Sequence, residues 1–516
     1  MNLKLLGKII GKIMVLEGIL MCFPLIVCLL YQEEVRYTLS FIIPIVVLIG
    51  GGFLLQLLQP PRKGLYQKEG FALCAIAWLI MTIFGAIPFV INQDIPNYID
   101  ALFETMSGFT TTGASIVTDV TALSHSSLFW RSFTHWIGGM GILVFILIFI
   151  PESDDGSSLH LLKAESPGPQ VGKIASKMKI TTRILYLIYL GLTILEVILL
   201  LFSPEHIGPD GTVYKMDVFN ALLASFGSAG TGGFGFVANS MEYFSPYTQY
   251  VIATFLIIFG INFSLYYILL IGKVKEIFKS EELRTYLTII VVAIALIVFN
   301  VISNQIHSLQ ELTPGLLEET FRHAYFQVAS IITTTGFSTI NYDAYWPVLA
   351  KTVILILMVC GAMAGSTGGG IKVSRLVIAV KGIGLRIRKL INPRYVAKTK
   401  FEGKSLETST IDDVFAFLTM YGLLAFVITI ILAFDPCNGA IHTIDGITVE
   451  HGIMTNFSAT ISCLSNIGPG LEAVGPYSSF AMYSGFSKII LTLAMLIGRL
   501  EILPVLILFH PRTWKK

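Results

Sequence analysis

The sequence has little charge for its length. Only 13% of its 516 residues are Asp, Glu, Lys or Arg, whereas 54% are hydrophobic. An average soluble protein has about twice that share of charge. The shortage excludes an ordinary cytosolic enzyme, a disordered scaffold and a nucleic-acid-binding protein, and a net charge of only +2 gives no bulk field that would attract an acidic partner. The composition instead predicts an all-α polytopic membrane protein whose surroundings are lipid.

Residue patterns that build metal and nucleotide sites are also absent. The six cysteines form no C-x-x-C pair, and the nine histidines form no H-E-x-x-H or H-x-x-x-H motif. Residues 230–235 fit G-x-G-x-x-G, but no strand is predicted before them and no helix opens after them. Residues 365–372 lack the G-K-[ST] ending of a phosphate-binding loop. We therefore predict that the chain is not an enzyme and holds no organic cofactor.

Long hydrophobic runs are abundant. A helix needs about 20 apolar residues to cross a bilayer, and ten runs qualify: 13–31, 38–59, 70–92, 126–150, 182–203, 246–272, 285–303, 346–364, 412–434 and 478–509. Shorter and less apolar stretches are long enough only for half-crossing helices: 97–110, 216–229, 317–333 and 449–463. Such re-entrant segments persist in a membrane only where protein surrounds them.

The basic residues indicate the orientation of these spans. With the N-terminus in the cytoplasm, 28 of the 35 Lys and Arg residues fall on the cytoplasmic side, which is the bias of the positive-inside rule. This orientation places the four short stretches on the outer side and returns the C-terminus to the cytoplasm. We expect a multi-pass protein of the cell inner (cytoplasmic) membrane.

After the first two spans, the chain repeats one unit: a span, a half-helix, a glycine-containing turn and a second span. The turns align at one glycine each: Gly113, Gly233, Gly336 and Gly468. Six positions earlier stands a serine in three copies and a glycine in the second: Ser107, Gly227, Ser330 and Ser462. The predicted organisation is a two-helix extension at 1–62 and pore repeats at 63–165, 166–280, 281–400 and 401–516.

Such a repeat favours a cation pathway. Four half-helices entering from one side would aim their partially negative C-terminal ends at a shared axis. Glycine turns around that axis can present rings of carbonyl oxygens that replace the water shell of a cation. No carboxylate lies within the aligned turns, which argues against a divalent-cation site. Because all four half-helices enter from the same side, a channel-like pore is favoured over a carrier with inverted repeats.

Several segments resemble the Trk/Ktr/HKT superfamily of cation transporters, and specifically its TrkH branch of potassium uptake proteins. They are T-T-T-G-A-S at 110–115, H-W-I-G-G-M-G-I at 135–142, K-A-E-S-P-G-P at 163–169, T-T-T-G-F at 333–337, A-G-S-T-G-G-G-I-K at 364–372, S-N-I-G-P-G at 465–470 and G-R-L-E-I at 498–502. The resemblance implies four linked span–pore-helix–span repeats around one pore. It also implies a homodimer, a cytoplasmic TrkA-type RCK nucleotide-binding regulator, and K⁺ as the transported ion.

By position, the resemblance places the ion-binding filter on three residues of each repeat: Thr111, Thr112, Gly113; Thr231, Gly232, Gly233; Thr334, Thr335, Gly336; and Asn466, Ile467, Gly468. In the plant branch, serine at the first filter glycine accompanies sodium preference, so Gly113 favours potassium. A sodium-permeable or sodium-coupled transporter of the same architecture is the alternative. Both passive conduction and ion-coupled symport fit the sequence. The extra glycines of the second turn, Gly230 and Gly232, predict a looser quarter of the filter.

A glycine-rich segment interrupts the last span of the third repeat. Each glycine disfavours a helix by about 1 kcal/mol, and five lie within ten residues: Gly361, Gly365, Gly368, Gly369 and Gly370. Irregular backbone at this depth must line a cavity. We expect a movable gating loop below the filter, as the resemblance also implies, with a fixed kink as the alternative.

Two charges belong to this region. Arg499 lies inside the last span, where a charge is costly and usually faces a cavity or a partner. We expect it to stand below the filter and limit leak; snorkelling or pairing with Glu501 is the alternative. Lys372 closes the glycine-rich segment, where it contacts the gate or, more simply, anchors the helix at the lipid headgroups.

Other basic residues have simpler expected roles. The ten between 372 and 404 predict anchoring on the cytoplasmic side, with docking of the regulator as the alternative. We expect Arg131, Lys351 and Lys488 to lie at the membrane interface.

Overall fold

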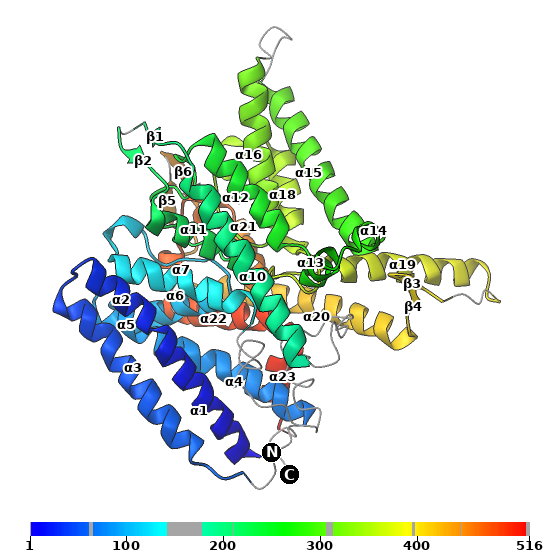
Figure 1. Cartoon of the computed structure of the whole chain (residues 1–516). Coiled ribbons are helices and arrows are strands. Elements are labelled where there is room, and N and C mark those ends of the chain that lie inside the picture. Colours follow the sequence, from blue (N-terminus) through cyan, green and yellow to red (C-terminus); the bar gives the residue numbers. More distant parts are fainter. Residues whose placement is uncertain are drawn as a thin grey trace.

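The computed structural model describes residues 2–60, 66–141, 178–209, 211–305, 313–394, 398–444 and 446–511. Helices dominate this part of the chain, which confirms the all-α expectation (Figure 1). The strands found there form three short antiparallel hairpins: β1 (His206–Ile207) with β2 (Val213–Tyr214), β3 (Lys400–Phe401) with β4 (Lys404–Ser405), and β5 (Ile441–Ile444) with β6 (Ile447–Glu450).

The first helices form a hairpin that lies against the rest of the protein. It consists of α1 (Leu3–Leu20), α2 (Cys22–Leu30) and α3 (Val35–Gln56), drawn in dark blue in Figure 1. A side chain at Gly11 would collide with the backbone oxygen of Gly52, and the reverse also holds. Small residues therefore let α1 and α3 approach closely, as is common between membrane helices.

Four units follow, each with a first, a central and a second helix. The first helices are α4 (Gln67–Gly85), α10 (Met178–Leu201), α15 (Glu281–Gln305) and α20 (Thr408–Leu432). The central helices are α6 (Tyr98–Phe109), α11 (Val218–Gly230), α16 (Pro314–Ile332) and α21 (Ile453–Ser465). The second helices are α7 (His125–Gly139), α12 (Pro246–Phe259), α18 (Val348–Val359) and α22 (Gly485–Arg499).

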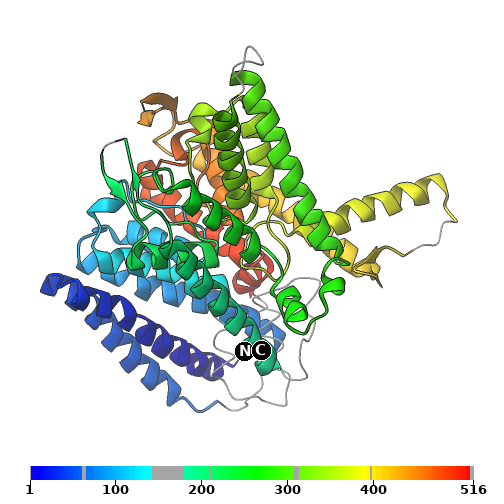
Figure 2. The same ribbon diagram turned by 45° about the horizontal axis from the view of Figure 1, so that its top comes forward.

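Further helices connect or extend these units. They are α5 (Ile87–Ile91), α13 (Phe263–Leu270), α14 (Val274–Ile277), α17 (Tyr342–Tyr345), α19 (Val373–Ile391) and α23 (Leu503–Phe509), with 3-10 turns at Val120–Ala122, Glu472–Val474 and Phe480–Met482. Helix α19 projects from the body as an arm (Figures 1 and 2).

The second helices are shorter than the prediction of ten spanning runs implies. In the described chain, six helices are long and apolar enough to cross a membrane, and the pair α12–α13, bent by 93°, makes a seventh if it is one span. Each second helix has only 12 to 15 residues. Each ends within two residues of a glycine: Gly139, Gly260, Gly361 or Gly498. The predicted span at 126–150 is described only as far as Gly141.

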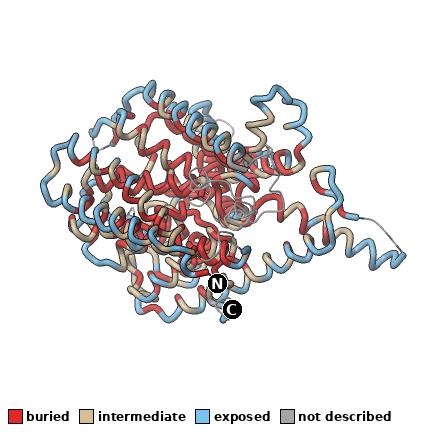
Figure 3. Tube along the Cα trace, turned by 60° about the horizontal axis from the view of Figure 1, so that its bottom comes forward, coloured by how far each residue is buried: buried red, intermediate tan, exposed pale blue. Residues whose placement is uncertain are grey.

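Burial is inverted relative to a soluble protein. Large apolar side chains are exposed on outer helices, among them Leu54, Leu187 and Phe299. Hydroxyl and amide side chains around the four glycine turns are fully buried, among them Thr111, Thr334 and Asn466. Figure 3 shows this buried centre in red. Since lipid solvates an apolar exterior, the arrangement is that of a multi-pass membrane protein.

Part of the predicted organisation lies outside the described residues. The repeat boundaries at 62/63 and 165/166 fall there, as does the K-A-E-S-P-G-P segment at 163–169. The boundary at 280/281 coincides with the start of α15, and that at 400/401 lies within β3. The division into repeats at these residues stays a prediction.

Candidate functional site

The four central turns share one backbone conformation. Each follows the C-terminal end of a central helix, at residues 111–113, 231–233, 334–336 and 466–468. The first residue of each turn is left-handed, with φ of 54° at Thr111, 54° at Thr231, 58° at Thr334 and 58° at Asn466. The glycine two positions later also has positive φ in every turn, between 68° and 109°. A β-branched residue rarely adopts this region, so its recurrence at three threonines indicates a shared constraint.

The same hydrogen bond ends every central helix. The amide of the second turn residue donates to the carbonyl oxygen five residues earlier: Thr112 to Ser107 at 2.9 Å, Gly232 to Gly227 at 2.8 Å, Thr335 to Ser330 at 2.8 Å and Ile467 to Ser462 at 3.0 Å. This is the longer bond of the Schellman motif, in which the left-handed position is usually glycine. Threonine and asparagine fill it here, so the constraint comes from the tertiary structure and not from local preference.

The turns close a ring. A side chain at Gly113 would collide with the carbonyl oxygen of Gly232 in the second turn. In the same way, a side chain at Gly233 would collide with the Thr335 carbonyl oxygen, and one at Gly336 would collide with the Ile467 carbonyl oxygen. A Cβ at Gly468 would lie 2.9 Å from the Thr112 carbonyl oxygen, so the fourth turn contacts the first. The contacts therefore run from the first unit through the fourth and back, which places the four turns around one axis with carbonyl oxygens at their junctions.

Side chains behind the ring hold it in place. The hydroxyl groups of Thr110 and Thr112 lie 2.8 Å apart, as do those of Thr333 and Thr335. The Asn466 amide bridges units by donating to Thr112 Oγ1 at 2.9 Å and to a backbone oxygen of α22 at 2.9 Å.

The aligned serine position also supports the turns, to a different degree in each unit. Ser330 Oγ donates to the Phe337 carbonyl at 2.6 Å and accepts from the Gly336 amide at 3.1 Å. Ser462 Oγ donates to the Gly468 carbonyl at 2.7 Å. In the second unit a side chain at Gly227 would strike the ring of Phe337, which explains the missing serine.

The glycines of the second turn make room for a histidine. A side chain at Gly232 would overlap the imidazole of His135, and one at Gly230 would overlap the His135 backbone. The buried ring lies 2.8 Å from the Gly108 carbonyl through Nδ1, and its Nε2 accepts from the Phe234 amide at 3.3 Å. The space that the two glycines leave is therefore filled by a neighbouring unit, contrary to the expectation of a loosened turn.

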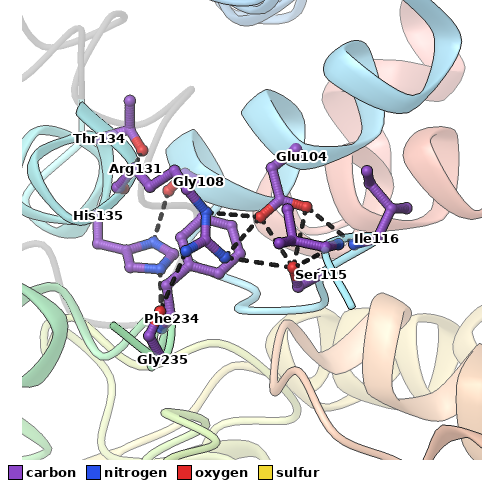
Figure 4. Close-up of polar contacts among 10 residues, drawn as sticks. Glu104, Gly108, Ser115, Ile116, Arg131, Thr134, His135, Phe234 and Gly235 are labelled. Atoms are coloured by element: carbon purple, nitrogen blue, oxygen red, sulfur yellow. Dashed lines mark hydrogen bonds and ion pairs between the residues drawn. The ribbon is translucent and has the colours of Figure 1, made fainter. Parts of the chain in front are cut away.

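A buried ion pair lies beside this histidine (Figure 4). Arg131 Nη2 lies 2.7 Å from Glu104 Oε1, with both side chains almost fully buried. Arg131 also donates to the Gly235 carbonyl at 3.0 Å, and Glu104 accepts from the Ile116 amide at 2.9 Å. The pair thus links the segment after the first turn to the segment after the second.

The expected interfacial position of the basic residues on the second helices is wrong for two of the three. Arg131 is 2% exposed and Lys488 is 6% exposed. Each has a carboxylate partner on α6, which for Lys488 is Asp100 at 2.7 Å. Lys351 keeps about a third of its side chain exposed, beside Asp343 at 3.4 Å.

The glycine-rich segment at 361–372 forms a loop directly against the central turns. The Gly369 amide donates to Thr334 Oγ1 at 2.6 Å, and a side chain at Gly369 would strike the Ser465 carbonyl. Positive φ at Gly365 and Gly370 bends the loop. Lys372 is buried and its Nζ donates to the Gly368 carbonyl within the loop, so an anchor at the lipid headgroups does not fit its position.

One carboxylate fastens both ends of this loop. Glu282, 4% exposed on α15, accepts from the Ala364 amide at 2.8 Å and the Ser374 amide at 3.0 Å through the same oxygen. Sequence reasoning missed Glu282. The only available signal was an acidic residue at the inner end of a span with no predicted partner.

Arg499 joins the loop to the ring. Its guanidinium donates to Thr111 Oγ1 at 3.1 Å and to the Thr367 carbonyl of the loop at 3.0 Å. It also donates to the carbonyls of Gly138 and Gly139 at 2.5 and 2.9 Å. Glu501 instead pairs with Arg375. With these contacts, Arg499 neither snorkels to the membrane surface nor pairs with Glu501.

The two faces of the ring differ in open space. On one face lies a cavity of about 540 Å³ bordered by all four turn glycines. On the other face lies a space of about 90 Å³, lined by loop glycines with Lys372, Arg499 and Trp78. The structure therefore brings all twelve predicted turn residues together and sets the predicted gate residues against one face of them, except Gly361, which packs against Gly369 and Gly370 within the loop.

Comparisons with known proteins agree with this architecture. The family model for TrkH, a cation transport protein, matches residues 40–516. Over the full length of both chains, this chain is 30% identical to the Trk system potassium uptake protein TrkH of Escherichia coli K12 and 32% identical to that of Vibrio parahaemolyticus. The crystal structure of the potassium transporter TrkH from Vibrio parahaemolyticus superposes with a TM-score of 0.82 at 29% identity, covering all of both chains.

Proposed function

The chain belongs to the TrkH family of cation transport proteins, and from this premise we propose that it takes up potassium across the inner (cytoplasmic) membrane through the ring of central turns. The relatives supply the ion, since those of Escherichia coli and Vibrio parahaemolyticus are named potassium uptake proteins. The twelve turn residues act as the selectivity filter, and K⁺ is the cargo. The observation that carries the proposal is the closed order of contacts from each turn glycine to the next turn's carbonyl oxygen.

The filter chemistry follows from that ring. Carbonyl oxygens around an axis replace the water that a cation loses on entering. The C-terminal ends of α6, α11, α16 and α21 reach the turns, so their dipoles add partial negative charge there. With no carboxylate in the turns, the site favours a monovalent ion. The cavity of about 540 Å³ serves as the outer vestibule from which ions enter.

The loop at 361–372 and Arg499 form the gate in this proposal. They occupy the inner side of the filter, where only about 90 Å³ of space is left. Two cationic side chains, Lys372 and Arg499, face that space and oppose a dehydrated cation. Opening then requires the loop to leave Thr334 and Arg499, with which it shares hydrogen bonds.

A second copy of the chain and a cytoplasmic TrkA-type RCK regulator complete the proposal. The family resemblance supports both. The projecting arm supports the second, because exposed basic side chains line α19 on the side predicted to be cytoplasmic: Arg386, Arg388 and Lys389. Movement of α19, which begins one residue after the loop, gives a regulator a direct mechanical route to the gate.

The test is ion flux into liposomes that contain the purified protein, with K⁺, Rb⁺, Na⁺ and Li⁺ compared side by side. We expect K⁺ and Rb⁺ to pass far faster than Na⁺ and Li⁺. Equal passage of Na⁺ would favour the sodium-permeable alternative and overturn the filter assignment. No flux of any ion, both alone and with an RCK regulator added, would overturn the transport proposal.

A further inference from the structure

A large cavity lies away from the central turns, between the N-terminal hairpin and the first two units. Its volume is about 860 Å³, within the range of about 300–1,000 Å³ that is typical of ligand pockets. One wall comes from α1, α2 and α3, and the other from α7, α10 and α11. The cavity is open to the surface, and four of its helices (α1, α2, α3 and α10) also expose apolar side chains outward.

The walls of this cavity are apolar. Of its 18 lining residues, all but Lys12, Gln56 and Thr193 are hydrophobic, and six are aromatic, including Trp136, Phe133 and Phe226. The Thr193 hydroxyl is already bonded, since it donates to the Tyr189 carbonyl at 2.9 Å and accepts from the Trp136 indole at 3.3 Å. Water needs two to four polar partners in such a space, so the cavity suits a hydrocarbon occupant.

Lys12 is the only charged residue of the lining. It is half-buried on α1, and no carboxylate within ion-pair distance is found for it in the described residues. Lys8 and Lys4 follow at intervals of four residues along the same face of the helix. In the orientation that the basic residues predict, this end of α1 lies at the cytoplasmic surface, where anionic lipid headgroups attract such side chains.

We propose that this groove, defined by the residues of α1, α2, α3, α7, α10 and α11 that line it, binds an anionic phospholipid of the cytoplasmic leaflet. An acyl chain occupies the apolar cavity, and the headgroup phosphate lies at Lys12. The charge complementarity at Lys12 selects an anionic over a zwitterionic lipid. This site is separate from the ion pathway and does not depend on the proposed function.

A lipid bound in the groove would stabilise two helices that position the filter. The same α7 that supplies Phe129, Phe133 and Trp136 to the groove carries His135 against the second turn. The central helix α11 supplies Leu222 and Phe226. A lipid in the groove therefore fills the space between the N-terminal hairpin and two elements that position the turns.

Trp136 gives a direct readout, because bromine on an acyl chain quenches a tryptophan that it contacts. The full-length protein is placed in phosphatidylcholine vesicles that contain one-tenth brominated phosphatidylglycerol or, in parallel, one-tenth brominated phosphatidylcholine. The contribution of Trp136 is the difference between the natural chain and Trp136→Phe. We expect at least twofold stronger quenching of Trp136 by the brominated phosphatidylglycerol.

Matched variants test whether Lys12 causes the preference for phosphatidylglycerol. Lys12→Ala should equalise quenching by the two lipids, whereas Lys4→Ala, on the same helix face but outside the groove, should preserve the difference. Leu222→Trp, which fills the cavity, should reduce the phosphatidylglycerol retained by the detergent-purified protein in native mass spectrometry. Equal quenching in the natural chain, or an unchanged preference in Lys12→Ala, would overturn the proposal. Absence of quenching by either lipid would overturn it too, since protein would then fill the groove.

Discussion

The two faces of the ring of central turns are built on different plans. The outer face opens into about 540 Å³ bordered by all four turn glycines, so each unit contributes the same element. The inner face retains about 90 Å³, because the loop of the third unit and Arg499 of the fourth lie against it. In the proposed function, the turn repeated in all four units therefore forms the surface that recognises the ion, and features found in single units form the part that closes the pathway. Substitutions on the outer face should reduce transport, and those on the inner face should increase it.

The largest expected effect is on the outer side, at Gly233. Its φ is +68°, and a Cβ there would collide with the Thr335 carbonyl, so Gly233→Ala distorts the junction between two turns. We expect Rb⁺ uptake to fall by roughly 100-fold, since strain of a few kcal/mol is enough. Gly235→Ala is the matched control, because the nearest atom to its Cβ would be the Val237 oxygen at 3.6 Å. Uptake retained by Gly233→Ala would show that the ring does not carry the ion.

The buried pair beside the turns should dominate stability. Glu104→Ala leaves Arg131 buried without its carboxylate, and breaking such a pair costs about 3 to 5 kcal/mol. We expect a marked fall in the melting temperature of the purified protein. Glu205→Ala is the control, because the Glu205–Lys215 pair is more than half exposed at 55% and 59% and such pairs contribute about 1 kcal/mol or less. Equal melting temperatures for both variants would mean that Glu104 and Arg131 do not brace the ring.

On the inner side, Arg499→Ala should increase ion flux, whereas Gly233→Ala should reduce it. It removes a positive charge and the hydrogen bonds that Arg499 donates to the first turn, to the loop and to α7. We expect flux in liposomes to rise roughly tenfold, which corresponds to about 1.4 kcal/mol. Arg499→Lys separates the two causes, because it keeps the charge but loses the planar fork of donors. If flux in Arg499→Ala stays at the level of the natural chain, Arg499 is not a barrier.

Glu282 tests whether the loop moves. Glu282→Ala removes the acceptor for the Ala364 and Ser374 amides, so the loop should open more often and flux should rise severalfold. Glu282→Gln keeps an oxygen at the accepting position, and we expect flux near that of the natural chain. An equal rise in both variants would point to the charge of Glu282, whereas no rise in either would favour a fixed kink.

The sequence predicted the repeating parts better than the contacts between them. The glycine alignment located all four turns, because the glycine with positive φ in each turn can be read in that turn's own sequence. The breaks after α12 and α22 were missed because apolar residues lie on both sides of Gly260 and on both sides of the Gly498–Glu501 segment. Arg131 was misplaced because its partner Glu104 lies 27 residues away on another helix. Whether His135 fills the space at Gly232 depends on how two units pack, which neither segment encodes alone.

The smallest expected effects come from the serines that support the turns, and their effect on ion selectivity should differ from unit to unit. Ser330 makes two hydrogen bonds to its turn, Ser462 makes one, and Ser107 Oγ has no partner among the described residues. A typical hydrogen bond contributes about 1 kcal/mol, so Ser330→Ala should raise the Na⁺-to-K⁺ permeability ratio most, Ser462→Ala less and Ser107→Ala least. The measurement is that ratio in liposomes for the three variants. Equal ratios would mean that the serines do not tune the filter, and a largest effect at Ser107 would contradict the assigned contacts. The graded order would show that the four units, although alike in backbone, support the same ring with unequal strength.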